Sequence, residues 1–100
     1  HSVVRRRTLE LAGQTIEGLD ELGFRISTPR EERRRSAIVF ASLEGMDGAK
    51  LAGYFRKKGV WVTARRYGRI SGIRLSPYFY TSEDDVQEFL NAASEIARRT

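Results

Sequence analysis

The stretch that decides the fold is SAIVFASLEGMDGAKLAGYFRKKGVWVTARRYGRISGIRLS, residues 36–76. It opens with SAIVFAS (36–42), which is apolar on both faces and therefore predicts a strand in the centre of a sheet. Three further segments end the stretch. They are VWVTA (60–64), which predicts a strand, RRYGR (65–69), which predicts a tight turn, and ISGIRLS (70–76), which predicts the returning strand.

A short helix over residues 47–58 connects the first two strands. Asp47 can cap its start and Gly59 can end it. Leu51 and Phe55 share one side of it. A strand, a helix and a second strand in this order form a crossover, so the two strands should run parallel, with a right-handed connection. The strand after the tight turn should run antiparallel to the one before it.

Two elements precede this stretch. Apolar residues recur at three- and four-residue steps from Val4 to Leu22, which predicts an amphipathic helix that Gly23 ends. FRIST (24–28) alternates apolar and polar side chains, as an edge strand does. REERRR (30–35) is then a polar connection to the central strand.

A last helix follows the returning strand. Thr81 or Ser82 can cap it, and apolar residues recur at helical spacing from Val86 to Ala97. Acids fill its first turn and arginines its last, which suits the helix dipole. The element order is therefore α-β-β-α-β-β-α, an α+β domain whose mainly antiparallel sheet of about four strands is covered by helices. If the last strand lies between the second and third, the spatial order is 1-2-4-3.

The composition describes one globular domain over residues 1–100. One hundred residues suffice for a single modest core, and 40% hydrophobic with 31% charged residues is ordinary for such a chain. No apolar run approaches the roughly 20 residues that cross a bilayer, and nothing resembles a signal peptide. We therefore expect a cytoplasmic protein without membrane contact. His1 and Ser2 are as typical of a cloning remnant as of native sequence.

Two residue types that carry much of enzyme chemistry are scarce. The chain has no cysteine, which excludes a disulfide framework, a thiolate nucleophile and a cysteine-ligated metal. Its one histidine is His1, so we expect no metal site and no histidine base.

The net charge of +5 and the isoelectric point near 10.1 raise the question of nucleic-acid binding. The cations fall in clusters where solvated residues are expected, on helix faces, at a strand entry and in the hairpin turn. No stretch has the aromatic and basic spacing of the common RNA-binding sheets. A stand-alone basic module for nucleic acid therefore stays as the alternative function, and we expect no specific nucleic-acid partner.

Arg74 interrupts an otherwise apolar strand. Alternation places Ile73 and Leu75 on one face of this strand. Arg74 leaves from the other face beside Gly72, which provides room next to it. Spacing alone favours a partly exposed arginine paired with an acid over a functional cation.

The aromatic residues have simpler interpretations. We expect Phe40 and Trp61 in the core. Tyr78, Phe79 and Tyr80 either pack in the core or form a surface for a further domain, and the sequence does not separate these alternatives.

Three segments together resemble a known family. They are IEGLDELGFRISTP (16–29), RSAIVFAS (35–42) and LAGYFRKKGVWVTARRYGRISGIRLSPYFYTSEDDVQEFLNAA (51–93). They are similar to the C-terminal small domain of the class V aminotransferases, which are pyridoxal-phosphate enzymes of fold type I. The similarity is greatest to the isopenicillin N epimerase-like and cysteine desulfurase-like branch. There the last strand and helix read Arg-x-Ser-Pro-His-x-Tyr-Asn-Thr before two or three acids, and the matching run begins here at Arg74.

The resemblance implies a role for Arg74 and a longer parent enzyme. The family's matching arginine binds the α-carboxylate of an amino-acid substrate, a role that suits the planar guanidinium fork. The parent would be a homodimeric transaminase, epimerase or lyase with pyridoxal phosphate as cofactor and a large domain that is missing here. Lys50, Lys57 and Lys58 all lie on one short helix, and none matches the cofactor lysine. This chain alone should therefore bind no cofactor and be inactive.

Two positions and one segment depart from the family pattern. Tyr78 stands where the family has His, and Thr81 where it has Asn. The segment 65–68 stands where cysteine desulfurases carry the cysteine that accepts sulfur. Because no cysteine exists anywhere in the chain, the resemblance disfavours a desulfurase that works through a persulfide on this domain.

Overall fold

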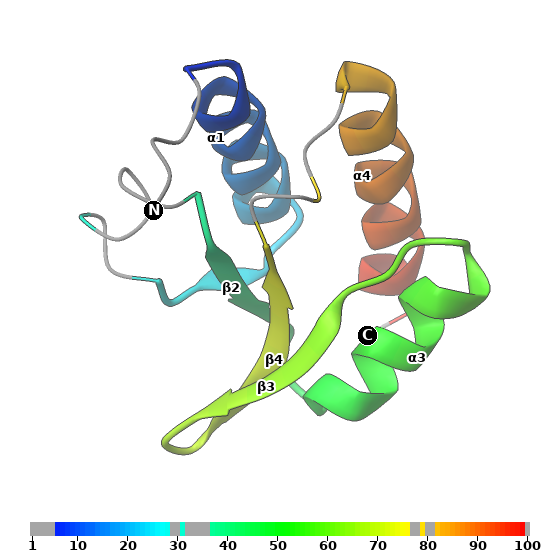
Figure 1. The fold of residues 1–100 in the computed structure, drawn as a ribbon. Helices are drawn as coiled ribbons and strands as arrows, with labels where there is room; N and C mark the ends of the chain where they lie inside the picture. Colours follow the sequence, from blue (N-terminus) through cyan, green and yellow to red (C-terminus); the bar gives the residue numbers. More distant parts are fainter. Residues whose placement is uncertain (1–5, 29–30, 32–36, 77–78, 80–81, 100) are drawn as a thin grey trace.

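The computed structural model describes residues 6–28, 31, 37–76, 79 and 82–99. Its helices and strands are α1 (Arg6–Glu21), β1 (Arg25–Ile26), β2 (Val39–Ser42), α3 (Gly48–Lys57), β3 (Thr63–Tyr67), β4 (Ile70–Leu75) and α4 (Glu83–Arg98). This is the predicted α+β order (Figure 1). Predictions for Val4, Tyr78, Tyr80 and Thr81, and for most of the connection at 30–35, fall outside the described residues.

The sheet has four strands in the order β1-β2-β4-β3, which confirms the predicted order. The three pairings between neighbours are all antiparallel. β2 and β3 both run opposite to β4, which lies between them, so they run parallel to each other as a crossover requires. The four residues of β2 are all buried, as expected of a central strand.

β3 lies further along the chain than the sequence predicts. It runs over Thr63–Tyr67. The prediction of a strand at 60–64 was therefore wrong for residues 60–62, and the prediction of a turn at 65–69 was wrong for residues 65–67. The backbone N–H of Val60 donates to the carbonyl oxygen of Phe55 at 2.9 Å. The chain directly after α3 therefore closes that helix before the strand begins.

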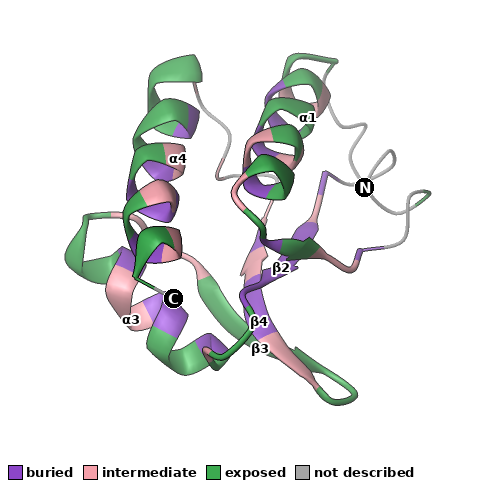
Figure 2. Ribbon diagram, turned by 180° about the vertical axis from the view of Figure 1, so that it is seen from behind, coloured by how far each residue is buried: buried purple, intermediate pink, exposed green. Residues whose placement is uncertain are grey.

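The turn between β3 and β4 is shorter than predicted. Tyr67 pairs with Ile70, which leaves two residues in the loop, and Gly68 has a φ of 60°. Two-residue hairpin loops favour positive φ, which glycine adopts without strain. In Figures 1 and 2 the tip of this hairpin projects away from the helices, and all five residues of β3 are exposed.

The helices α1, α3 and α4 pack against one face of the sheet. Strand and helix residues of this face belong to one buried cluster, visible in Figure 2 as the buried inner sides of the helices. Its principal members are Val39, Ala41, Leu43, Ile73 and Leu75 from the sheet side, with Leu11, Leu19, Leu51, Phe55, Val86, Phe89, Ala93 and Ile96 from the helices. Phe55 and Phe89 stack at its centre with ring centroids 4.8 Å apart.

Phe40 and Trp61 were both predicted to be core aromatics, and the prediction is wrong for Trp61. Phe40 is fully buried, whereas 73% of Trp61 is exposed. Val60 and Val62 pack against the core, so Trp61 between them points outward. Its ring lies under the guanidinium of Arg56, 5.1 Å from the ring centroid.

Phe79 packs in the core rather than lying free on the surface. Its ring meets the edge of Phe89 with centroids 5.2 Å apart, and it joins the buried cluster as a partly buried member. The two tyrosines beside it lie outside the described residues.

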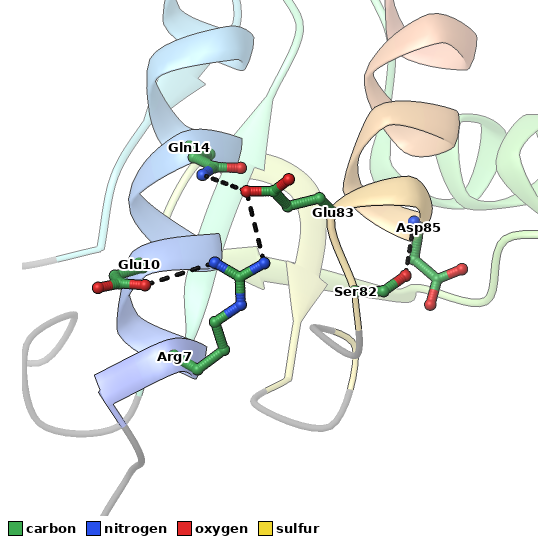
Figure 3. Close-up of polar contacts among 6 residues, drawn as sticks. All are labelled: Arg7, Glu10, Gln14, Ser82, Glu83 and Asp85. Carbon is green, nitrogen blue, oxygen red and sulfur yellow. Dashed lines mark hydrogen bonds and ion pairs between the residues drawn. The ribbon is translucent and has the colours of Figure 1, made fainter.

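Side chains cap the starts of two helices. The Oδ1 of Asp47 accepts a hydrogen bond from the Lys50 backbone N–H at 2.8 Å, as predicted. The Oγ of Ser82 accepts from the Asp85 backbone N–H at 3.2 Å, so Ser82 is the cap of α4 (Figure 3). Each cap satisfies a backbone donor that the first helical turn leaves without a partner.

α1 and α4 lie side by side, with polar contacts near the start of α4. A carboxylate oxygen of Glu83 lies 3.4 Å from Arg7 and 3.5 Å from Gln14, as Figure 3 shows. Further along, a Cβ on Gly18 would come within 2.6 Å of Leu90, so the helices approach closely there. Among the described residues, no helix is long and apolar enough to span a membrane.

Candidate functional site

Arg74 lies on the sheet face away from the helices, which we call the outer face. The strand register places Phe40 on one side of it, on β2, and Thr63 on the other, on β3. By the same register, the outer-face residues are Arg25, Phe40, Ser42, Thr63, Arg65, Tyr67, Ile70, Gly72 and Arg74. The predicted split of β4 is therefore confirmed, with its apolar pair in the core and its arginine outside.

The guanidinium of Arg74 has no partner among the described residues. The residue is partly exposed, and its Nε is buried without a hydrogen bond there. The ion pairs between described residues do not include it. The residue spacing favoured an arginine paired with an acid, and the described part of the chain contains no such pair for Arg74. A buried donor left unpaired costs about 1–3 kcal/mol, so the described residues alone leave this Nε unfavourably placed.

Gly72 lies beside Arg74 under a pair of aromatic rings. A Cβ at this position would collide with the carbonyl oxygen of Ala41, so the approach of β2 requires glycine. The rings of Phe40 and Tyr67 meet edge to face with centroids 4.5 Å apart. Because these residues come from β2 and β3, their rings can meet only over β4, where Gly72 has no side chain. The room that glycine provides is therefore filled by this pair.

The described strands place only positive charge on the outer face. Its charged residues are Arg25, Arg65 and Arg74, and no acidic residue of the strands shares the face. None of the three takes part in an ion pair within the described residues. Such a local excess of one sign attracts small anions.

The lysines of this chain do not fit pyridoxal phosphate. Lys50 and Lys57 are exposed on α3, and Lys58 is the residue that ends it. The amine of Lys58 lies 2.8 Å from Glu95, and this hydrogen bond raises the pKa of Lys58. A Schiff base forms from the neutral amine, so this pair disfavours it. α3 also lies on the face of the sheet opposite Arg74. Among the described residues, no group of acids or histidines could hold a metal ion.

A second polar cluster joins the ends of α3 and α4. The hydroxyl of Tyr54 donates to the Ala92 carbonyl oxygen at 2.9 Å and lies 3.2 Å from Glu95 Oε1. Hydrogen bonds from Lys58 and Tyr54 lower the pKa of Glu95. Burial, followed by the contact with Glu95, raises the pKa of Tyr54. These shifts favour charged Glu95, charged Lys58 and neutral Tyr54, which are the forms that make the contacts. The cluster therefore stabilises the helix pair and shows no acid or base tuned for catalysis.

Two solved structures share this fold. The apo cysteine desulfurase of Thermococcus onnurineus NA1 matches 97% of the chain with a TM-score of 0.84 and 23% sequence identity. A NifS-like protein matches 95% of the chain with a TM-score of 0.79 and 25% identity. The chain has the small-domain fold of the class V aminotransferases. It spans only 26% and 28% of the lengths of these two proteins. No protein-family model and no curated protein sequence matches the chain.

Within this class V small-domain fold, sequence reasoning located Arg74 and missed its neighbours. Arg65 and Tyr67 were expected in a turn, where they would have had no fixed relation to Arg74. The structure places both in β3, on the same face as Arg74. A signal was present in the sequence, because glycine in a two-residue loop at 68–69 would have extended the strand to Tyr67.

Proposed function

We propose that this chain is the C-terminal small domain of a pyridoxal-phosphate enzyme that acts on an amino acid, and that Arg74 binds the substrate's α-carboxylate. The observation that carries the proposal is the guanidinium of Arg74, which has no partner among the described residues and is held on a rigid strand, on a face where the described strands place no acid. A guanidinium binds a carboxylate through two parallel hydrogen bonds, which fix the orientation of the substrate as well as its position.

The rest of the active site comes from a large domain in the same parent protein, in a homodimer. The lysines here do not fit the cofactor, so the large domain holds it, and pyridoxal phosphate supplies the electron sink of the reaction. Trp61, with 73% of its surface exposed, is suited to a contact with that domain. The two solved structures of similar fold support a parent of about this architecture, since the chain matches only a part of each.

The reaction is that of a transaminase, an epimerase or a lyase rather than a persulfide-forming desulfurase. One matching structure is a cysteine desulfurase. This chain has no cysteine, so no thiolate on this domain can accept sulfur. Arg65 and Arg66 occupy the segment where the sequence resemblance would place that thiol.

Replacement of Arg74 in the full-length enzyme tests the proposal. Arg74→Ala should lower kcat/KM for the amino-acid substrate roughly 30- to 1000-fold, about 2 to 4 kcal/mol, because a bidentate charge-assisted contact is lost. Arg74→Lys should restore only part of the activity, since an ammonium group is a point charge and not a fork. Steady-state kinetics would measure both effects.

Two controls accompany these variants. In this chain, Arg74→Ala should not lower the free energy of unfolding in urea by more than about 1 kcal/mol, because the Nε has no partner to lose and its removal takes away an unpaired buried donor. The reading frame should also encode a large domain with a cofactor lysine. Kinetics within twofold of the unmutated enzyme, or a chain that unfolds on mutation, would refute the proposed role. A native reading frame limited to this domain would favour the nucleic-acid module.

A further inference from the structure

Arg65 is the near neighbour of Arg74 on the outer face. Arg65 pairs with Gly72, two residues before Arg74 on β4, and Arg74 pairs with Thr63, two residues before Arg65 on β3. Residues in this diagonal relation lie about 7–8 Å apart across an antiparallel pair. Two arginine side chains that leave the same face at this separation can reach opposite ends of one small molecule.

Neither of these two arginines is neutralised by the described part of the chain. Arg65 is exposed and, like Arg74, forms no ion pair there. Like charges placed this close repel, and an anion between them relieves the repulsion. Charges also protect an edge strand such as β3 from pairing with other chains. Arg66 already serves that purpose, so protection of the edge does not require a second cation on the face of Arg74.

We propose that the substrate is a dicarboxylic amino acid, with Arg74 bound to its α-carboxylate and Arg65 to the carboxylate of its side chain. The inference rests on the function proposed above for Arg74. The ring of Tyr67, 48% exposed, lies with that of the buried Phe40 over Gly72, and it offers an apolar surface to the methylene groups between the two carboxylates.

The other arginines of the sheet are less well placed for this role. Arg66 pairs with Ser71 and therefore points to the helix side of the sheet. Arg25 shares the outer face but lies on β1, and β2 separates it from the strand of Arg74. Of the other arginines in the described strands, only Arg65 is on the correct face and on a strand adjacent to that of Arg74.

Titration of this chain with two simple carboxylates tests the inference. Glutarate and pentanoate have the same number of carbon atoms, and pentanoate lacks the second carboxylate. In NMR spectra of the ¹⁵N-labelled chain at low ionic strength, both should shift the side-chain N–H signal of Arg74. Glutarate should also shift that of Arg65 and bind about three- to tenfold more tightly, because a second charged contact forms.

Two variants of β3 with the same change in charge separate specific binding from general attraction. Arg65→Gln should abolish the preference for glutarate and leave the affinity for pentanoate nearly unchanged. Arg66→Gln removes the same charge from the opposite face and should keep the preference. An equal loss of glutarate affinity in both variants would overturn the inference, because it would indicate only general charge attraction.

The remaining outcomes distinguish the two proposals. If pentanoate binds through Arg74 and glutarate binds no more tightly, the dicarboxylate inference is wrong and the role of Arg74 stands. If Arg74→Ala leaves the binding of both carboxylates unchanged, the proposed role of Arg74 fails, and the inference fails with it.

Discussion

Glu95 receives two donors where the ends of α3 and α4 meet. Lys58 lies 2.8 Å from its carboxylate, and the hydroxyl of Tyr54 lies 3.2 Å from the same oxygen. An acid near the end of a helix interacts unfavourably with the helix dipole, so Glu95 depends on these donors for any stabilising effect. The contact is exposed, and its value therefore depends on both groups being charged.

A double-mutant cycle of Glu95→Gln and Lys58→Gln should reveal a favourable coupling energy at pH 7. The cycle cancels the effect of each residue on its own helix dipole. The pKa of Glu95 is lowered from its ordinary 4.5, so the stability it contributes is complete above that value and is lost as the pH falls through the lowered pKa. The pKa of Lys58 is raised from 10.5, so its contribution is complete below 10.5 and is lost as the pH rises through the raised pKa.

Urea unfolding of the four proteins across this pH range measures the coupling. It should disappear below the lowered pKa of Glu95 and weaken in concentrated salt, which screens exposed charges. A coupling energy that stays the same at acid pH, where Glu95 is protonated, would show that packing and not charge joins the two residues.

At the scale of elements, the contact of α3 with β4 depends on glycine. A Cβ on Gly48 would collide with the carbonyl oxygen of Gly72, so the start of α3 lies directly against the backbone of the strand. The backbone N–H of Gly48 also donates to the Oγ of Ser71 at 2.7 Å. This contact fixes the helix against the strand that carries Arg74.

Gly48→Ala should therefore destabilise the fold, and Gly53→Ala should not. The first adds a methyl group where backbone leaves no space, which costs about 1–3 kcal/mol. The second lies in the same helix with nothing within 4 Å of its Cβ position, and it should stabilise by about 0.5–1 kcal/mol because glycine is unfavourable in a helix interior. Free energies of unfolding in urea measure both. Equal effects would mean that helix propensity, and not close approach, decides the outcome at Gly48.

The boundaries of elements were harder to predict than their order. The two-residue turn and the closure of α3 by Val60 moved β3 towards the C-terminus by about half its length. Side chains alternate along a strand, so the position of a strand decides which residues share a face. Arg65 and Tyr67 therefore became neighbours of Arg74 only once the register was known. Trp61 was predicted to be buried because it is a large aromatic residue. The alternation of side chains, with Val60 and Val62 in the core, places it outside instead.

At the scale of the whole molecule, the sequence was sufficient for the topology. The crossover rule and a tight hairpin together permit few strand orders, and 1-2-4-3 was among them. The described helices cover one face of the sheet, and Arg74 lies on the other. That Arg74 has no partner among the described residues was not predictable from the sequence. It depends on the distances in space between its guanidinium and the acids of those residues.

Within the part of the chain that the structure describes, the positive charge is distributed over several elements rather than along one groove. Arg25 and Arg65 are on the outer face, Arg66 is on the other face of the sheet, and further cations end α3 and α4. Nucleic-acid sites instead align cations along one surface that follows the phosphate backbone. Trp61, the most exposed aromatic residue among those described, is already covered on one side by Arg56 and is not an open stacking platform.

We therefore expect this chain to bind nucleic acid only weakly and without sequence preference. Each phosphate contact releases condensed counterions, so binding that rests on scattered cations should be lost between roughly 50 and 200 mM salt. Fluorescence anisotropy with two labelled RNAs of equal length and unrelated sequence would measure this, and the affinities should agree at each salt concentration. Arg65→Gln and Arg66→Gln should weaken binding equally, because neither position belongs to a specific groove. Sub-micromolar affinity for one RNA that persists at the higher salt concentration would overturn the proposed enzyme domain in favour of a nucleic-acid module.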